Sequence, residues 1–211
     1  TVSKYQTACG TVDILMHTFE RYFTHTPDVD LTDELAEGLC RAVIRAGTKA
    51  VKNGSDYEAR ATLMWAGSIS HNDLTGLGRR GDWATHQIEH ELSGQYDRVS
   101  HGAGLAAIFP AWCRYVWREE PARFVRFAHN VMGVELGLSD DETALLGIER
   151  MEDFFRSIHM PTSLGELGVH PTEDQLCELA HKCKIAVGGL LGSAKRLDES
   201  DMLAIYKAAN H

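Results

Sequence analysis

One aspartate and four histidines have the residue types and spacing to do chemistry. They fall in two segments, Asp13 and His17 in the first and His86, His90 and His101 in the second. Residues four apart lie on one face of a helix, so each segment would place its first two side chains together. A carboxylate with several imidazoles is a ligand set for a divalent transition metal. If four of these five residues bind the metal, one histidine is left over. It could transfer protons or contact one of the ligands.

Two other interpretations of these residues stay open. Asp13 and His17 could form an ordinary solvent-exposed ion pair. The order His86-Gln-Ile-Glu89-His90 matches the His-x-x-Glu-His pattern of inverted zinc proteases, in which Glu89 would activate water in a metal hydrolase. Such a short pattern can arise by chance in a chain with 11 histidines. The remaining histidines have no partner at ligand spacing, and surface or core positions suffice for them: His25, His71, His129, His159, His170, His181 and His211.

Helices are expected to hold these side chains, because apolar residues recur at helical spacing and no segment alternates with period two. The pattern predicts helices at 5–23, 31–51, 55–72, 82–92, 105–117, 122–134, 144–158, 172–183 and 202–209. The start signals are Asp82, Pro121, Asp198 and the capping boxes Ser55 with Glu58, Ser139 with Glu142 and Thr172 with Gln175. The segment 93–94 should end one helix, Pro110 should bend or restart another, and 76–81 should be a solvated loop. The fold class is therefore all-α, a bundle-like domain of eight to ten helices.

Composition limits the classes of partner and compartment. With 211 residues and 44% hydrophobic content, the chain can bury the core of a single domain spanning 1–211. A net charge of -9 without a basic stripe argues against nucleic acid and against an anionic membrane surface. No stretch reaches the roughly 20 apolar residues of a membrane helix, so we expect a cytoplasmic protein. The five cysteines are odd in number and form no Cys-x-x-Cys pair, which indicates buried thiols in a reducing compartment.

The amino-acid sequence of four segments resembles that of the iron-dependent alcohol dehydrogenases. The resemblance is to the branch of the butanol dehydrogenases and aldehyde reductases. These segments are 5–10 (Tyr-Gln-Thr-Ala-Cys-Gly), 13–23, 82–92 and 100–102 (Ser-His-Gly). The resemblance covers nearly the whole chain. It implies the helical, dehydroquinate synthase-like C-terminal domain of that family.

The resemblance also implies roles for the five residues. By position, Asp13, His17, His86 and His101 would bind the metal, and His90 would be the catalytic histidine close to substrate and nicotinamide. The family name suggests Fe²⁺, and Zn²⁺ would also suit one aspartate with three histidines. The metal would polarise the oxygen of a small primary alcohol or aldehyde while hydride passes between carbon and NAD(P).

Members of this family also carry an N-terminal α/β domain that binds the dinucleotide, and nothing in this chain matches a strand, a Gly-rich turn and a helix. The chain does not begin with Met, and we expect a fragment with little or no hydride transfer of its own. A non-enzymatic or truncated helical module that has inherited the metal site is the alternative. A face left uncovered by the missing domain could also drive homodimer formation.

Overall fold

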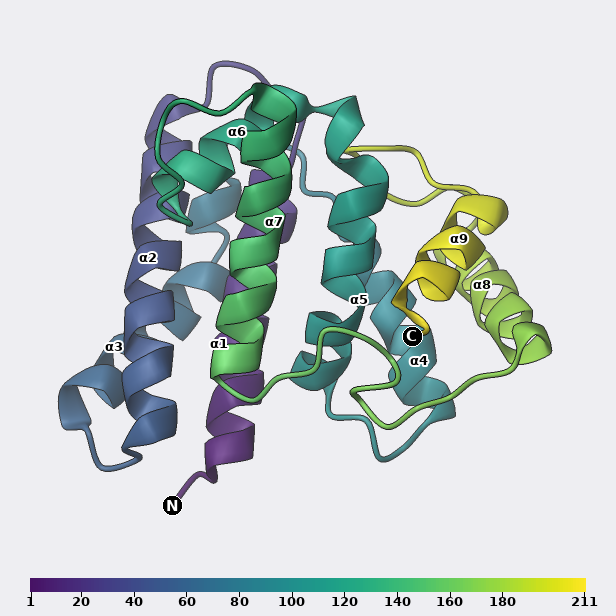
Figure 1. Ribbon diagram of the computed structural model, residues 1–211, viewed down its shortest axis with the longest axis horizontal. Coiled ribbons are helices and arrows are strands. Elements are labelled where there is room, and N and C mark those ends of the chain that lie inside the picture. Colours follow the sequence, from purple (N-terminus) through teal and green to yellow (C-terminus); the bar gives the residue numbers. More distant parts are fainter.

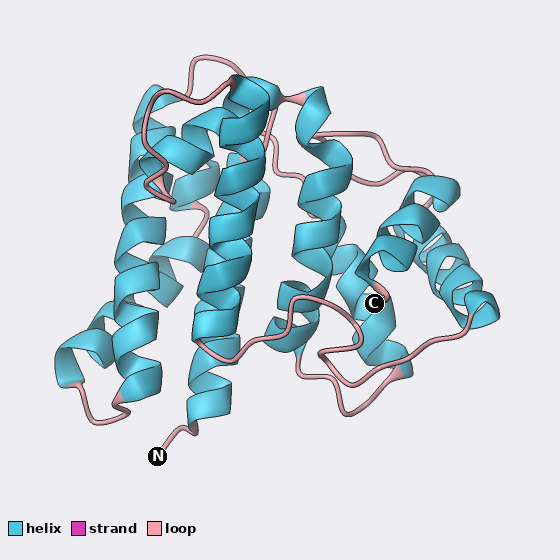
Figure 2. Cartoon of the chain, in the orientation of Figure 1, coloured by secondary structure: helices cyan, strands magenta, loops and turns pink.

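Helices make up every regular element of the chain. The computed structural model describes residues 1–211 and contains no strand, only an isolated bridge between Leu191 and Leu197 (Figure 2). The α-helices are α1 (Lys4–Tyr22), α2 (Asp30–Lys52), α3 (Tyr57–His71), α4 (Ala84–Gln95), α5 (His101–Val116), α6 (Pro121–Asn130), α7 (Asp140–Ser157), α8 (Glu173–Val187) and α9 (Glu199–Ala209). Two 3₁₀ helices, η1 (Leu74–Gly76) and η2 (Trp117–Glu119), lie between them. The predicted all-α class and the predicted number of helices are confirmed.

Helix α5 stands between two groups of helices (Figure 1). On one side are α1, α2 and α3 with α6 and α7, and on the other are α4, α8 and α9. Helix α5 packs against α1 and α7 in the first group and against α4 and α9 in the second. This arrangement brings the two segments of the candidate metal ligands together, since α1, α4 and the start of α5 carry them.

An aromatic cluster fixes α1 against α5 and α6. Phe19 of α1 stacks on Phe109 of α5 with ring centroids 5.4 Å apart. Phe23, which caps the C-terminal end of α1, stacks on Phe124 of α6 at 4.4 Å and contacts Trp112 of α5. Aromatic pairs contribute roughly 0.5–1.5 kcal/mol each beyond the apolar area that they bury. These contacts belong to a continuous core of 55 buried residues, which holds the helices around the site in fixed relative positions.

The loop before α4 is exposed at Leu77, Gly78 and Arg80, as predicted, but a buried charge anchors it at Arg79. The Arg79 side chain is fully buried and its Nη1 lies 2.5 Å from Oδ1 of Asp33 in α2. The other oxygen of Asp33 pairs with Arg123 of α6 at 2.5 Å. The prediction of a solvated loop was therefore wrong for Arg79. A pattern of local hydrophobicity cannot identify an ion pair between residues 46 positions apart.

Some helix boundaries differ from the predicted ones. Helix α4 continues through Gly94 to Gln95, because one glycine costs only about 1 kcal/mol in a helix and the neighbouring Leu92 is fully buried. Helix α5 runs without a break through Pro110. The capping boxes at Ser139 and Thr172, the cap Asp198 and the first-turn position of Pro121 are confirmed. Four cysteines are buried as predicted, but Cys177 is exposed.

The N-cap of α3 differs from the predicted one, and this difference can be tested. Asp56, not Ser55, is the N-cap, and its side chain accepts a hydrogen bond from the backbone N–H of Ala59 at 3.0 Å. We expect Asp56→Ala to lower the free energy of unfolding by about 1 kcal/mol, the usual contribution of such a cap. Ser55→Ala, the matched control, should change it by less than about 0.5 kcal/mol. Urea denaturation of the two variants measures the difference, and equal losses would contradict the assignment.

Candidate metal centre

Three helices converge on one oxygen atom of Asp13. Oδ1 of Asp13 lies 3.8 Å from Nε2 of His17 and 3.7 Å from Nε2 of His86. Nε2 of His101 lies 3.5 Å from the same oxygen. The carboxylate and the first imidazole come from the middle of α1, the second imidazole from α4 and the third from the first residue of α5. The structure thus brings together four of the five residues that the sequence singled out.

The spacing of Asp13, His17 and His86 and their hydrogen bonding fit a metal ion, with His101 close to the carboxylate alone. In a tetrahedral site with bonds of about 2.1 Å, ligand atoms lie about 3.4 Å apart. The ligand atoms of Asp13, His17 and His86 all lie within 4.8 Å of one another. Oδ1 of Asp13 and Nε2 of His86 are buried and have no hydrogen-bond partner. Buried polar atoms are nearly always paired, so two unpaired atoms that face each other indicate room for a shared cation.

Glycines let α5 approach close enough to place His101 at this point. A Cβ atom on Gly102 would overlap the backbone carbonyl oxygen of Cys9 in α1. A Cβ atom on Gly104 would overlap the Glu89 side chain of α4. The Gly-Ala-Gly sequence after His101 therefore serves helix packing.

The titration behaviour of the cluster follows from burial and from mutual charge. Burial raises the pKa of Asp13, but its contacts with His86 and the neighbouring imidazoles outweigh burial, so the pKa lies below its ordinary value. Burial lowers the pKa of His17 to about 4, and the charges of His86 and His71 act in the same direction. Burial would also lower the pKa of His86, but contacts with Asp13 and Glu20 outweigh it and raise the pKa to about 9. At neutral pH the metal-free cluster thus holds a carboxylate, a neutral His17 and a protonated His86.

This protonation pattern predicts how metal binding depends on pH. An ion must displace the proton of His86, so the apparent affinity for Zn²⁺ should rise by up to about tenfold per pH unit from pH 7 towards 9 and then level off. His17, with a pKa of about 4, should add no dependence in this range. Zn²⁺ titration against a competing chelator at several pH values measures the slope. An affinity that is flat between pH 7 and 9 would contradict the assignment of the proton to His86.

His90, the fifth candidate, lies beside His101 but makes no close contact with Asp13. It is exposed, and its ring centroid lies 5.3 Å from that of His101 and 6.1 Å from that of His86. Partial desolvation lowers its pKa below the ordinary value, with the charge of His101 acting in the same direction. His90 is therefore neutral at pH 7 and open to solvent beside the cluster, where it can accept or donate a proton.

Sequence reasoning missed Glu20 and His71, which touch the cluster, and gave Glu89 the different role of a hydrolase base. His71, at the end of α3, lies with Nε2 3.5 Å from Oδ2 of Asp13, and its ring lies over that of His17 with centroids 3.8 Å apart. Glu20 and Glu89 contact the Nδ1 atoms of His86 and His101. The only available signal for Glu20 was its place three positions after His17, a candidate ligand that it does not contact. His71 had no signal, because the packing of α3 on α1 alone places it there.

The hydrolase interpretation is not supported by this geometry. The Glu89 side chain is completely buried and faces Nδ1 of His101. It therefore has no route to a solvent-derived water molecule in the way that the base of a metal hydrolase requires. His90, the second histidine of that motif, is exposed and groups with Glu89 and His101, whereas His86, the first, groups with Asp13 and His17, so the two histidines of the motif do not share one group.

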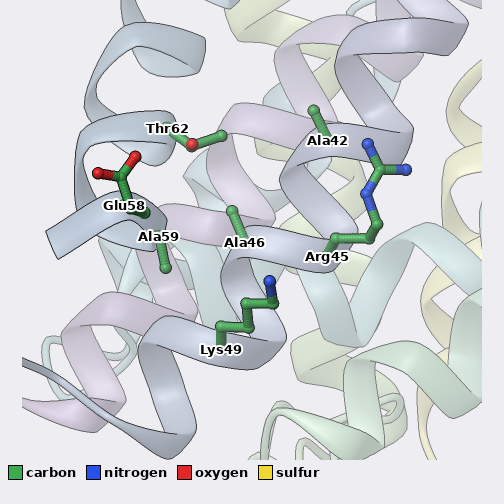
Figure 3. A pocket seen from close by; sticks show the side chains of 7 residues that line it. All are labelled: Ala42, Arg45, Ala46, Lys49, Glu58, Ala59 and Thr62. Carbon is green, nitrogen blue, oxygen red and sulfur yellow. The ribbon is translucent and has the colours of Figure 1, made fainter. Parts of the chain in front are cut away.

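A separate hollow of about 310 Å³ lies between α2 and α3 (Figure 3). Arg45 and Lys49 from α2 and Glu58 and Thr62 from α3 surround it. It contains neither a histidine nor a nucleophilic thiol, and every residue of the metal cluster lies outside it. This hollow is therefore separate from the cluster around Asp13. None of the helices has the length and apolar content needed to cross a membrane.

Known proteins of one family match this chain over nearly its whole length. Residues 7–210 match the family model described as "Fe-containing alcohol dehydrogenase family, C-terminal". The probable NADH-dependent butanol dehydrogenase 1 of Bacillus subtilis is 39% identical over 99% of this chain and 53% of its own length. The NADPH-dependent aldehyde reductase YqhD of Escherichia coli is 35% identical over 80% of this chain and 43% of its own length.

Solved structures give the same result. NADH-dependent butanol dehydrogenase A of Thermotoga maritima superposes with a TM-score of 0.93 at 37% identity, over 100% of this chain and 54% of the other. Aldehyde reductase YqhD of E. coli superposes with a TM-score of 0.92 at 32% identity, over 99% of this chain and 54% of the other. The chain thus spans about half the length of these relatives. By its sequence match and by its fold, it belongs to the Fe-containing alcohol dehydrogenase family and corresponds to the C-terminal domain of that family.

Proposed function

We propose that the chain is the metal-binding catalytic domain of an NAD(P)-dependent alcohol dehydrogenase or aldehyde reductase. The reaction would transfer hydride between a small primary alcohol or aldehyde and nicotinamide. The convergence of three imidazole nitrogens on Oδ1 of Asp13 carries this proposal. The relatives include an NADH-dependent butanol dehydrogenase and an NADPH-dependent aldehyde reductase, which supply the class of reaction.

The proposed ligands are Asp13, His17, His86 and His101. When bound, a divalent ion supplies Lewis acidity at the oxygen of the substrate. The side chain of His86 is 6% exposed and closes the inner side of the site, whereas that of His101 is 38% exposed. A substrate oxygen would therefore enter from the side of His101. Iron is the metal in the family's name, and Zn²⁺ would also fit this donor set.

His90 is the proposed proton-transfer residue. Alcohol oxidation releases the hydroxyl proton and aldehyde reduction consumes one, so the site needs a group that exchanges protons with solvent. His90 is neutral at pH 7, exposed, and next to His101 at the open side. It can therefore pass a proton between the substrate oxygen and water.

The dinucleotide would bind to a part of the enzyme other than the residues described here. The regular elements of those residues are all helices, and no strand leads through a Gly-rich turn into a helix. In the whole enzyme, the nicotinamide ring would approach the exposed side of the metal cluster. We therefore propose that the chain requires an N-terminal dinucleotide-binding domain for hydride transfer.

Removal of the metal should destabilise the chain. An ion present at 100 times its dissociation constant stabilises the folded state by about 2.7 kcal/mol. For a chain of this size, that corresponds to a decrease in melting temperature of roughly 5–10 °C after chelation. Calorimetry before and after dialysis against chelator, followed by addition of Zn²⁺, measures the effect. An unchanged melting temperature would count against a ligand set that joins α1, α4 and α5.

A test of substrate binding at the metal distinguishes an enzyme domain from a non-enzymatic module that has only inherited the metal site. In the Co²⁺-substituted chain, butan-1-ol or butanal should change the visible absorption bands, because a new oxygen ligand alters the coordination of the ion. The Asp13→Ala variant serves as the control and should show no response. Bound Co²⁺ whose spectrum ignores both compounds would favour a non-enzymatic helical module.

A further inference from the structure

Two buried glutamates lie directly behind two of the proposed ligands. Glu20 of α1 contacts Nδ1 of His86, and Glu89 of α4 contacts Nδ1 of His101. Both glutamate side chains are completely shielded from solvent. We propose that Glu20 and Glu89 are positioning residues of the metal centre, each of which fixes the tautomer and the orientation of one histidine. This inference rests on the proposed function, because it concerns the same site.

The reason lies in the single proton of a neutral imidazole. A carboxylate accepts hydrogen bonds only, so a carboxylate at Nδ1 holds the ring proton on that nitrogen. Nε2 is then left with a lone pair that can bind a metal. In both His86 and His101, Nε2 is the atom directed at Oδ1 of Asp13, at 3.7 and 3.5 Å. The glutamates thus orient both rings towards the same point.

The two glutamates differ in the other hydrogen bonds that they accept. Oε1 of Glu20 also accepts hydrogen bonds from the backbone N–H groups of Thr85 and His86, at 2.6 and 3.1 Å, and so caps the start of α4. Glu89 makes no other hydrogen bond, and its Oε1 is buried without a partner. A buried carboxylate with an unpaired oxygen is costly for stability. The contact with His101 is therefore the only interaction that accounts for a glutamate at position 89.

The neighbouring helix is shaped to admit the Glu89 carboxylate. A Cβ atom on Gly104 would overlap Oε1 of Glu89, so only glycine leaves the space that the carboxylate occupies. Gly104 follows His101 by three residues on the same helix. The first turn of α5 therefore supplies both the imidazole that Glu89 contacts and the space for its carboxylate. This arrangement explains a glycine in the first turn of an otherwise apolar helix.

The decisive variant is Glu89→Gln, which keeps the shape and removes the charge. We expect its dissociation constant for Zn²⁺ to rise by about 10- to 100-fold, the usual effect of losing such a partner. The melting temperature of the metal-free variant should stay the same or rise, since the uncompensated charge is removed. Glu91→Gln, which removes the same charge from the same helix, is the control and should leave the affinity unchanged. Glu20→Gln should lower both the affinity and the metal-free stability, because it also weakens the cap of α4.

A second readout is independent of affinity. In the Zn²⁺-loaded chain with ¹⁵N-labelled histidine, His86 and His101 should both carry their proton on Nδ1. Loss of this signature for His101 alone in Glu89→Gln would support the positioning role. Equal Zn²⁺ affinity in the parent and in Glu89→Gln would overturn this inference and leave the proposed function standing. Failure of the parent to bind metal would contradict both.

Glu89, His90 and His101 also form a group whose ligand atoms lie within 4.8 Å of one another. An ion held there would use the nitrogen or the carboxylate that the positioning role requires. Two Zn²⁺ ions per parent chain, with one lost in Glu89→Gln, would therefore also overturn the positioning role.

Discussion

Replacement of Asp13 by alanine is expected to abolish measurable metal binding. Asp13 supplies the only carboxylate oxygen that faces the Nε2 atoms of His17, His86 and His101. Its contacts with these imidazoles keep its pKa below the ordinary value despite burial, so it is ionised at neutral pH and carries the only negative charge among the ligands. Loss of a partner behind a ligand costs about 10- to 100-fold in affinity, and loss of the central ligand should cost more than about 100-fold.

Isothermal titration of Zn²⁺ into the metal-free chain measures this effect. Asp97→Ala, which removes an exposed carboxylate, is the control and should bind Zn²⁺ like the parent. Circular dichroism should show that Asp13→Ala remains helical, because its carboxylate makes no contact with the aromatic cluster. Full Zn²⁺ affinity in Asp13→Ala would contradict the assignment of the site.

Gly102→Ala is expected to destabilise the chain and to weaken the metal site together. The added methyl group would overlap the backbone carbonyl oxygen of Cys9, and a backbone atom cannot move aside as a flexible side chain can. Helices α1 and α5 would have to separate, which should cost about 3 kcal/mol, at the upper end of the usual range for an overpacked core. The same separation would move His101 away from Asp13, so Zn²⁺ affinity should fall as well.

Gly10→Ala is the matched control, because Gly10 follows Cys9 on α1 and a Cβ atom there meets no other atom within 4 Å. It should be neutral or stabilise α1 by up to about 1 kcal/mol. Thermal unfolding and Zn²⁺ titration of both variants test the prediction. A Gly102→Ala variant that is as stable as the parent would show that α1 and α5 do not depend on this close contact.

Local sequence signals were enough to predict the fold class and much of the helix pattern. Apolar spacing identified the helices, and Ser139, Thr172 and Asp198 marked three helix starts because a capping side chain bonds to residues only two or three positions away. The same locality placed Asp13 beside His17 on one face of α1. The structure also brings His101 beside His86, with ring centroids 5.2 Å apart.

The other contacts of the site could not be predicted from the sequence, because they depend on how the helices pack against one another. Spacing alone made His90 as good a ligand candidate as His86, yet only the latter lies against Asp13. His71 reaches Asp13 through the packing of α3 on α1, and Glu20 reaches His86 across 66 positions of the chain. Helical periodicity carries no information about such contacts. The resemblance to a family, rather than the spacing, distinguished His90 from the ligands.

The most direct test of the account is the metal content of the purified chain. Elemental analysis should find close to one divalent ion per parent chain after equilibration with Fe²⁺ or Zn²⁺ and removal of free metal. The Asp13→Ala/His86→Ala variant should retain none, since it lacks the central oxygen and its most deeply buried imidazole partner. No metal in the parent, or equal metal in both proteins, would contradict the proposal that these residues form a metal centre.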